Sequence, residues 1–196
     1  MTTPISRLIQ KSILRTLGLG LLLNSLIIII ATPLLAADEA SSHAGGHQAS
    51  SAAKLVQHVR EGTRKYIDVN NATAAGYGPF LGCVAGTDHG AMGIHYVNGT
   101  LLGNLTLDPA QPEALIYEPS NGKMTLVGVE FILDATSWLA ANNNAPPVLD
   151  GQVFNFVGAP NRFNIPSFFE LHVWAWRDNP QGAFVDWNNL VTCEGQ

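Results

Sequence analysis

Residues 170 to 188 read ELHVWAWRDNPQGAFVDWN, which places an acid and an imidazole among three of the four tryptophans. Alternate residues of a β-strand point to the same face. One face of the predicted strand is therefore mixed in character, and it consists of Glu170, His172, Trp174 and Trp176. Polar groups between aromatic walls are typical of a pocket that binds a small molecule or an ion.

The same anomaly occurs in two other apolar segments. Glu130 lies within LVGVEFIL, residues 126 to 133, and His95 lies between Ile94 and Tyr96. Burying a lone carboxylate costs several kcal/mol unless it is paired, protonated or bound to a metal. A shared centre would explain all three anomalies, so His95, Glu130 and His172 are predicted to converge.

Nitrogen and oxygen ligands of this kind suit one divalent transition metal: zinc, manganese, iron or copper. The predicted ligands are His95, Glu130 and His172, with Glu170 or His89 as a further ligand. The alternative is that each group is satisfied locally, His172 by a backbone carbonyl and Glu130 by Arg162 or Arg177. No short ligand motif decides between the two interpretations, and the sequence names no reaction.

Glu118 is a weaker candidate than Glu130. If Asn121-Gly122 forms a two-residue turn, Glu118 faces Thr125 and points away from the side of Glu130. A bulge at Pro119 would reverse this assignment.

Two other functions remain open. The first is a metal-free, lipocalin-like module that binds an apolar or aromatic small molecule, oriented by Glu170 and His172. Its predicted ligand-binding residues are Trp174, Trp176, Trp187 and Tyr96. The second is a structural or envelope-associated protein with a packed interior and no small-molecule site.

The elements that must position these residues are mainly strands. A helix is expected over residues 51–75, where Leu55, Val59, Gly62, Tyr66 and Val69 recur at steps of four and three. Residues 80–196 are predicted to be β-rich, with short apolar runs separated by turn signals such as Asn121-Gly122 and Asp150-Gly151. Residues 135–147 are expected to form a short helix or a long loop.

The predicted fold is mainly β, of the α+β kind. Runs such as LVGVEFIL are apolar at nearly every position, so both faces of the sheet must be covered. We expect a curved antiparallel sheet or a small β-barrel with the N-terminal helix packed outside it. A two-layer α+β sandwich is the competing architecture.

The first 36 residues are predicted to be a signal peptide. Arg7, Lys11 and Arg15 precede an apolar run from Leu17 to Ile30 that is short for a membrane span. Removal would leave seven basic and fifteen acidic residues, a net charge of −8. Such a charge argues against nucleic-acid binding. The product is expected to be a periplasmic or secreted protein without a stable membrane span.

Residues 37–50 are predicted to be a flexible leader, because the stretch is small, polar and rich in glycine and serine. A single globular domain is expected over 51–196. It contains the only two cysteines, Cys83 and Cys193. In an oxidising compartment two well-separated cysteines most simply form a disulfide, which is the prediction here.

An ordered series of motifs also resembles a set of exported bacterial proteins of unassigned activity. The motifs are GYGPFLGCV, MGIHYVN, LDPAQPEALIYEP, LVGVEF and ELHVWAWRDNPQGAFVDWN, and the resemblance runs from about residue 63 to Cys193. It implies export but no catalytic role. Cupins are also small barrels with His/Glu metal sites, yet their His-x-His motif is replaced here by His95-Tyr96-Val97.

Overall fold

The computed structural model describes residues 39 to 194, and it describes side chains from Ser51 onward. The predicted signal peptide and the first residues of the predicted leader lie outside the described residues. The described chain falls within one unit, Asp38–Gln196. Within it, no helix combines the length and the apolar character that crossing a membrane would require.

The N-terminal segment forms three helices instead of the single helix expected over 51–75. They are α1 (Glu39–Thr63), the 3-10 helix η1 (Arg64–Ile67) and α2 (Val69–Ala74). α1 begins inside the range 37–50, so its backbone is helical where the sequence predicts a leader, and the flexibility of that range stays a prediction. The side chain of Asp68 caps α2 by accepting from the N–H of Asn70, which separates α2 from η1.

The apolar stripe predicted for this segment is confirmed. Leu55 and Val59 are fully buried, and Tyr66 on η1 is also buried. Gly62 belongs to the stripe for a different reason: a Cβ added there would lie 2.3 Å from the Cα of Ala110. Only glycine therefore allows the helix to pass so close to that loop.

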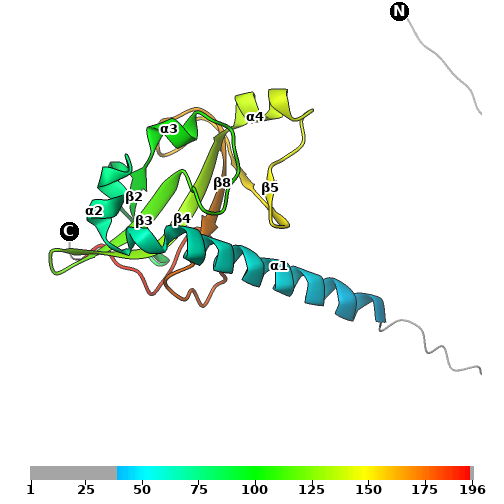
Figure 1. Ribbon diagram of the computed structural model, residues 1–196, viewed down its shortest axis with the longest axis horizontal. Coiled ribbons are helices and arrows are strands. Elements are labelled where there is room, and N and C mark those ends of the chain that lie inside the picture. Colours follow the sequence, from blue (N-terminus) through cyan, green and yellow to red (C-terminus); the bar gives the residue numbers. More distant parts are fainter. Residues whose placement is uncertain (1–38, 195–196) are drawn as a thin grey trace, which may run out of the picture. The chain divides into compact units, whose positions relative to one another are not determined.

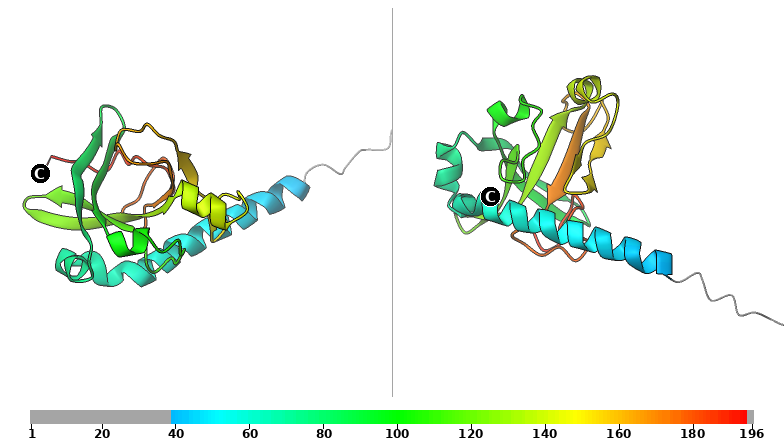
Figure 2. Two further views of the ribbon diagram at one scale, coloured as in Figure 1. Left: turned by 90° about the horizontal axis from the view of Figure 1, so that it is seen from above. Right: turned by 45° about the vertical axis from the view of Figure 1, so that its right-hand side comes forward.

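Six antiparallel strands form one curled sheet in the order β1-β2-β3-β4-β8-β7 (Figures 1 and 2). The strands are β1 (Gly78–Gly86), β2 (Gly90–Val97), β3 (Ala114–Ser120), β4 (Lys123–Asp134), β7 (Asn155–Val157) and β8 (Phe168–Val173). The mainly β class, the curved antiparallel sheet and the packed N-terminal helix are confirmed. The sheet is a half-barrel, because β1 and β7 are its two ends.

Residues with positive φ form two tight turns between consecutive strands. Asn121 and Gly122 both have positive φ, as a tight hairpin between β3 and β4 requires. Asp150 and Gly151 likewise join the two-residue strands β5 (Val148–Leu149) and β6 (Gln152–Val153). Two short helices complete the fold, α3 (Gly99–Leu102) and α4 (Ala135–Ala141). α4 is the short helix anticipated within 135–147.

One face of the sheet, here called the helix face, packs against the N-terminal helices and forms the main core. Leu115 of β3, Val129 and Phe131 of β4, and Leu171 and Val173 of β8 are all at most 2% exposed. They form one cluster with apolar residues of α1, η1 and α2. The other face, here called the inner face, is on the concave side of the curl seen from above in Figure 2.

The predicted disulfide is present between Cys83 on β1 and Cys193 near the C-terminus. It attaches the C-terminal segment to an edge strand of the sheet. Further contacts hold the same segment: Asn188 bridges to Ala91 of β2, and the N–H of Thr192 donates to Glu118 at 3.0 Å. The apolar run AFVDWN, residues 183 to 188, lies within the range predicted to be β-rich but forms turns and bends.

Candidate metal centre

His95, Glu130 and His172 lie on three strands and share the inner face. Their positions follow from strand alternation, because the neighbours of Glu130 and His172 on β4 and β8 all point into the helix-face core. Glu130 and His172 are register partners in the ladder between β4 and β8. His95 reaches them from β2, two strands away in the sheet order. The predicted convergence of these three residues is confirmed geometrically.

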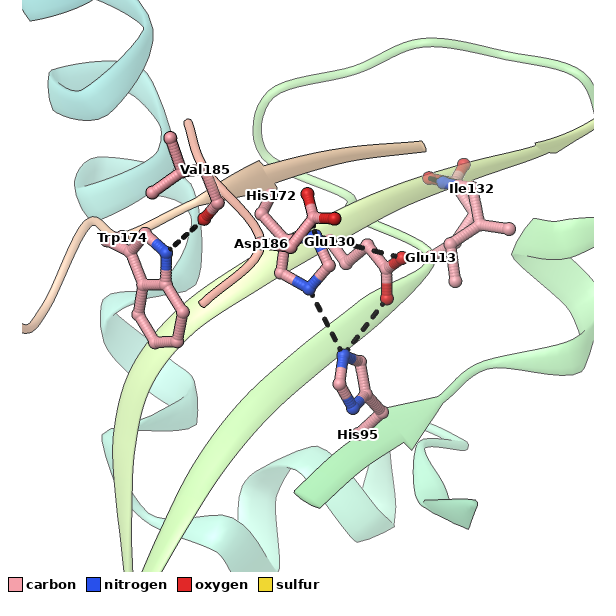
Figure 3. Close-up of polar contacts among 8 residues, drawn as sticks. All are labelled: His95, Glu113, Glu130, Ile132, His172, Trp174, Val185 and Asp186. Atoms are coloured by element: carbon pink, nitrogen blue, oxygen red, sulfur yellow. Dashed lines mark hydrogen bonds and ion pairs between the residues drawn. The ribbon is translucent and has the colours of Figure 1, made fainter. Parts of the chain in front are cut away.

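The donor atoms of the three residues meet at close range, as Figure 3 shows. The Nε2 atom of His95 lies 3.1 Å from Oε2 of Glu130 and 3.4 Å from Nε2 of His172. One donor atom from each residue falls within 4.8 Å of the others. Tetrahedral ligands with bonds of about 2.1 Å are separated by roughly 3.4 Å, so the observed spacing fits one ion.

A second group overlaps the first at His172. It contains Glu170 on β8 and Asp186 in the C-terminal segment, again with donor atoms within 4.8 Å. The Nδ1 atom of His172 is 3.8 Å from Asp186 and 4.0 Å from Glu130, and it has no hydrogen-bond partner among the described residues. This nitrogen therefore lacks the partner that buried polar atoms normally have, and Asp186 and Glu130 are the acids nearest to it.

Burial keeps both imidazoles neutral. It lowers the pKa of His95 to about 4, against a weaker opposing attraction from Glu170. It also lowers the pKa of His172 well below its usual value, and the neighbouring His95 adds to the effect. Neutral imidazoles have a free lone pair at pH 7, which is the form that binds a metal.

The pKa values of the neighbouring carboxyl groups are shifted in the opposite direction, upwards. Burial raises the pKa of Glu130 to about 7. Burial, with the nearby charge of Glu130 and their mutual hydrogen bond as further causes, raises the pKa of Glu170 to about 9. Asp186 also has a raised pKa because of burial, although its hydrogen bond with Glu170 opposes the shift. Glu130 and Glu170 therefore both favour their neutral forms more strongly than an exposed glutamate does.

The cluster borders a small cavity on the inner face. The cavity has a volume of about 50 Å³ and is lined by His95, Glu130, Glu170 and His172 together with apolar residues of β1, β2, β4, β8 and the β7–β8 loop. That volume accommodates an ion and a few waters. A second cavity of about 360 Å³ shares part of this lining.

Two side chains that the sequence offered as possible ligands, His89 and Glu118, lie outside the His95/Glu130/His172 cluster. His89 is exposed in the turn between β1 and β2, where its ring is 6.3 Å from that of Trp187. Glu118 pairs with Thr125, as the hairpin predicts, but its predicted orientation away from the side of Glu130 is wrong, because a register shift between Ile116 and Tyr117 puts Glu118 on the inner face. Its carboxylate accepts bonds from Arg177 and from the N–H of Thr192. Arg177 thus neutralises Glu118, and the local pairing of Glu130 with Arg177 is not observed.

The aromatic residues predicted to bind a ligand do not line either cavity. Trp174 remains on the inner face and stacks on His172, with ring centroids 6.3 Å apart, but its Nε1–H donates to the carbonyl of Val185. Tyr96 packs against Tyr117 at the main core, with centroids 4.9 Å apart. Trp187 lies near Arg162, with the guanidinium 5.6 Å from its ring.

The shared face predicted for Glu170, His172, Trp174 and Trp176 is wrong at Trp176. β8 ends at Val173, and the chain then bends so that the N–H groups of Trp176 and Arg177 both donate to the carbonyl of Val127. The irregular step redirects Trp176 to the helix face, where its Nε1–H donates to Thr63 at 3.0 Å. Strand alternation fails here because the strand has already ended.

Two acids near the site were missed from the sequence. Asp186 lies between Val185 and Trp187, which is the same signal of a polar residue in an apolar run that identified Glu130. Glu113 is 1% exposed, and burial raises its pKa to about 7. One of its oxygens accepts from the N–H of Ile132, and the other has no partner among the described residues.

Comparison with protein-family models, with curated proteins and with solved structures gives no match to this chain.

Proposed function

We propose that this protein binds one divalent transition metal through His95, Glu130 and His172. The observation that carries the proposal is the meeting of three donor atoms from three strands within 4.8 Å, all from buried residues. A metal ion would use the neutral imidazole lone pairs and compensate the buried carboxylate. Without one, burial favours the protonated form of Glu130, as its raised pKa indicates.

The donor set narrows the class of metal. Both cysteines are joined in the disulfide, so the described residues offer no thiolate to the site, and nitrogen and oxygen donors suit zinc, manganese, iron or copper. Three protein ligands leave a position for water or a small molecule, as in catalytic sites rather than closed structural ones. We therefore include a reaction on a small molecule in the proposal, without assigning its type.

The carboxyl groups around His172 have a supporting part in this proposal. Asp186 lies on the Nδ1 side of the ring, and Nε2 faces His95. With a metal on Nε2, an Nδ1–H directed at Asp186 would fix the tautomer, as carboxylate partners of metal-binding histidines do. Glu170 would supply either a further ligand or a hydrogen bond to Glu130.

We also propose that the protein is exported. The disulfide supports an oxidising compartment. The sequence of residues 1 to 36 supports the same location, and so does the resemblance of the motifs to those of exported bacterial proteins.

A metal-free binding function is the second candidate. The cavity of about 360 Å³, which is walled mainly by apolar side chains, favours it. The lining of this cavity differs from that of the pocket predicted from the sequence, because the tryptophans are not part of it.

Elemental analysis of the purified domain, compared with the variant His172→Ala, tests the metal proposal. We expect about one equivalent of a transition metal in the parent protein and at least about a tenfold lower affinity in the variant. The matched control is His89→Ala, which removes an exposed imidazole outside the site and should retain the metal.

Metal retention by His172→Ala equal to that of His89→Ala would contradict the proposal. A parent protein that binds no transition metal after dialysis against each candidate ion would favour the metal-free function instead. Circular dichroism should show that both variants keep the parent fold.

A further inference from the structure

The two cavities on the inner face adjoin each other. Both are lined by the same wall, which consists of Phe80, Val97, Ile132, Ile165 and Phe168. The smaller cavity contains the His/Glu cluster, and the larger one adds Leu102 of α3 and residues of the β7–β8 loop. The larger cavity, which is mainly apolar, therefore adjoins the smaller cavity that contains the polar groups.

The two polar side chains that line the larger cavity, Asp134 and Ser167, both take part in hydrogen bonds of the fold. Asp134 caps α4 by accepting from the N–H of Ser137 at 2.8 Å. The hydroxyl oxygen of Ser167 accepts from the N–H of Ala159 at 2.9 Å. A molecule in this cavity would thus meet mainly hydrocarbon and aromatic surface, and its polar contacts would have to lie at the inner end.

The charge of the lining limits what can reach the inner end. Among the described residues that line the two cavities there is no lysine or arginine, whereas Glu130 and Glu170 line the smaller cavity and Asp134 lines the larger one. One divalent ion would be balanced by the acids of the smaller cavity and by Asp186. An anionic ligand would find little net attraction, while a neutral oxygen could take the position left open on the metal.

We propose that the larger cavity binds a neutral, mainly apolar small molecule whose single terminal oxygen reaches the ion held by His95, Glu130 and His172. The inference rests on the proposed metal site for the contact with oxygen, but the apolar cavity exists independently of it. Its volume of about 360 Å³ is within the range of small-molecule sites. Phe80, which is 41% exposed, stands at the wall shared by both cavities.

The test uses 1-hexanol as a probe and cobalt(II) as a spectroscopic reporter. We expect 1-hexanol to bind the cobalt-loaded protein in calorimetry and to change the visible absorption of the cobalt. Hexanoate, which has the same chain length and a negative charge, should bind at least about tenfold more weakly. Equal affinity for the two would overturn the assignment to neutral ligands.

The variant Leu102→Trp tests the larger cavity independently of the metal site. Leu102 lines only the larger cavity, so the indole should fill it and weaken 1-hexanol binding at least about tenfold while cobalt affinity stays within about twofold. The control is Leu190→Trp at a residue that is 50% exposed and lines neither cavity. Should Leu102→Trp unfold, Pro166→Phe on the β7–β8 loop provides a second way to fill the larger cavity, because Pro166 lines that cavity and not the smaller one.

The outcomes distinguish the two proposals. Cobalt binding with no spectral response to 1-hexanol, or undiminished 1-hexanol binding by Leu102→Trp, would overturn the present inference and leave the metal site intact. Failure to bind cobalt would remove the metal proposal. In that case Leu102-dependent binding of 1-hexanol to the metal-free protein would support the cavity, and its absence would overturn the cavity as well.

Discussion

The helix face and the inner face of the sheet are built from alternate residues of the same strands, yet they differ in almost every property. On β4, Val129 and Phe131 are fully buried in an apolar cluster, while Glu130 between them points to the opposite side. On β8, Leu171 and Val173 repeat this pattern around His172. One face packs against helices, and the other surrounds two cavities.

This division indicates that the two faces make different contributions to the protein. Burial of apolar side chains on the helix face supplies folding free energy, at about 25 cal/mol per Å² of apolar surface. The inner face holds carboxyl groups whose raised pKa values show that burial penalises their charge. Stability and chemistry are therefore expected to respond to different substitutions, even at adjacent positions.

The largest effect on stability is expected from the helix face. Phe131→Ala should lower the free energy of unfolding by about 3–5 kcal/mol, because it leaves a cavity in the main core. The neighbouring Ile132→Ala is the matched comparison, since Ile132 already borders a cavity on the inner face. Its cost should be no more than about half as large. Chemical denaturation measures both, and equal losses would contradict the division between the faces.

The disulfide is expected to have the next largest effect. Replacing Cys83 and Cys193 together by alanine should lower the free energy of unfolding by about 2–5 kcal/mol, because the bridge closes a loop of 110 residues. The metal site should weaken in the same variant, since the C-terminal segment brings Asp186 to His172. Urea denaturation and metal titration would check the two effects. A variant as stable as the parent would contradict the first.

The stability of the metal-free protein should depend on pH mainly through the buried carboxyl and imidazole groups of the inner face. Glu170 has a folded-state pKa of about 9, above the ordinary value of 4.5, so the folded protein holds an extra proton between those values. Its contribution to stability is complete below pH 4.5 and falls as the pH rises towards 9. The lowered pKa values of His95 and His172 act in the opposite direction, but only up to about pH 6.5.

Between pH 7.5 and 9 Glu170 should therefore dominate, because Glu130 and Glu113 titrate near pH 7. We expect the metal-free protein to lose about 2 kcal/mol over this interval, from at most about 1.4 kcal/mol per pH unit for one group. Glu170→Gln should flatten the profile in urea denaturation series. A parent profile that is flat or rises over this interval would contradict the assignment.

The sequence allowed much of this arrangement to be predicted, because burial leaves a local signature. A charged or imidazole side chain within an apolar run identified His95, Glu130 and His172, and the Asn121-Gly122 turn gave the pairing of Glu118 with Thr125. These inferences need only alternation within one strand or one hairpin. Their convergence across β2, β4 and β8 then follows from the order of the strands in a curled sheet.

The features that were missed depend on contacts between distant segments. Residues 183 to 188 pattern like a strand, but the chain forms turns there and is held by the Asn188 bridge to Ala91 and by the disulfide. Asp186 therefore reaches the site from outside the sheet. The displacement of Trp176 likewise follows from the end of β8, and no local propensity in VWAWRD marks that point.

The open edge of the half-barrel has a mechanical consequence. In a closed barrel every strand has two neighbours, so a change of bore requires a change in ladder hydrogen bonds. Here β1 and β7 are not paired with each other. Phe80 and Leu81 of β1 line the same cavity as Phe163 and Ile165 of the β7–β8 loop. A change in the width of the interior at this edge would therefore not require ladder hydrogen bonds between β1 and β7 to break.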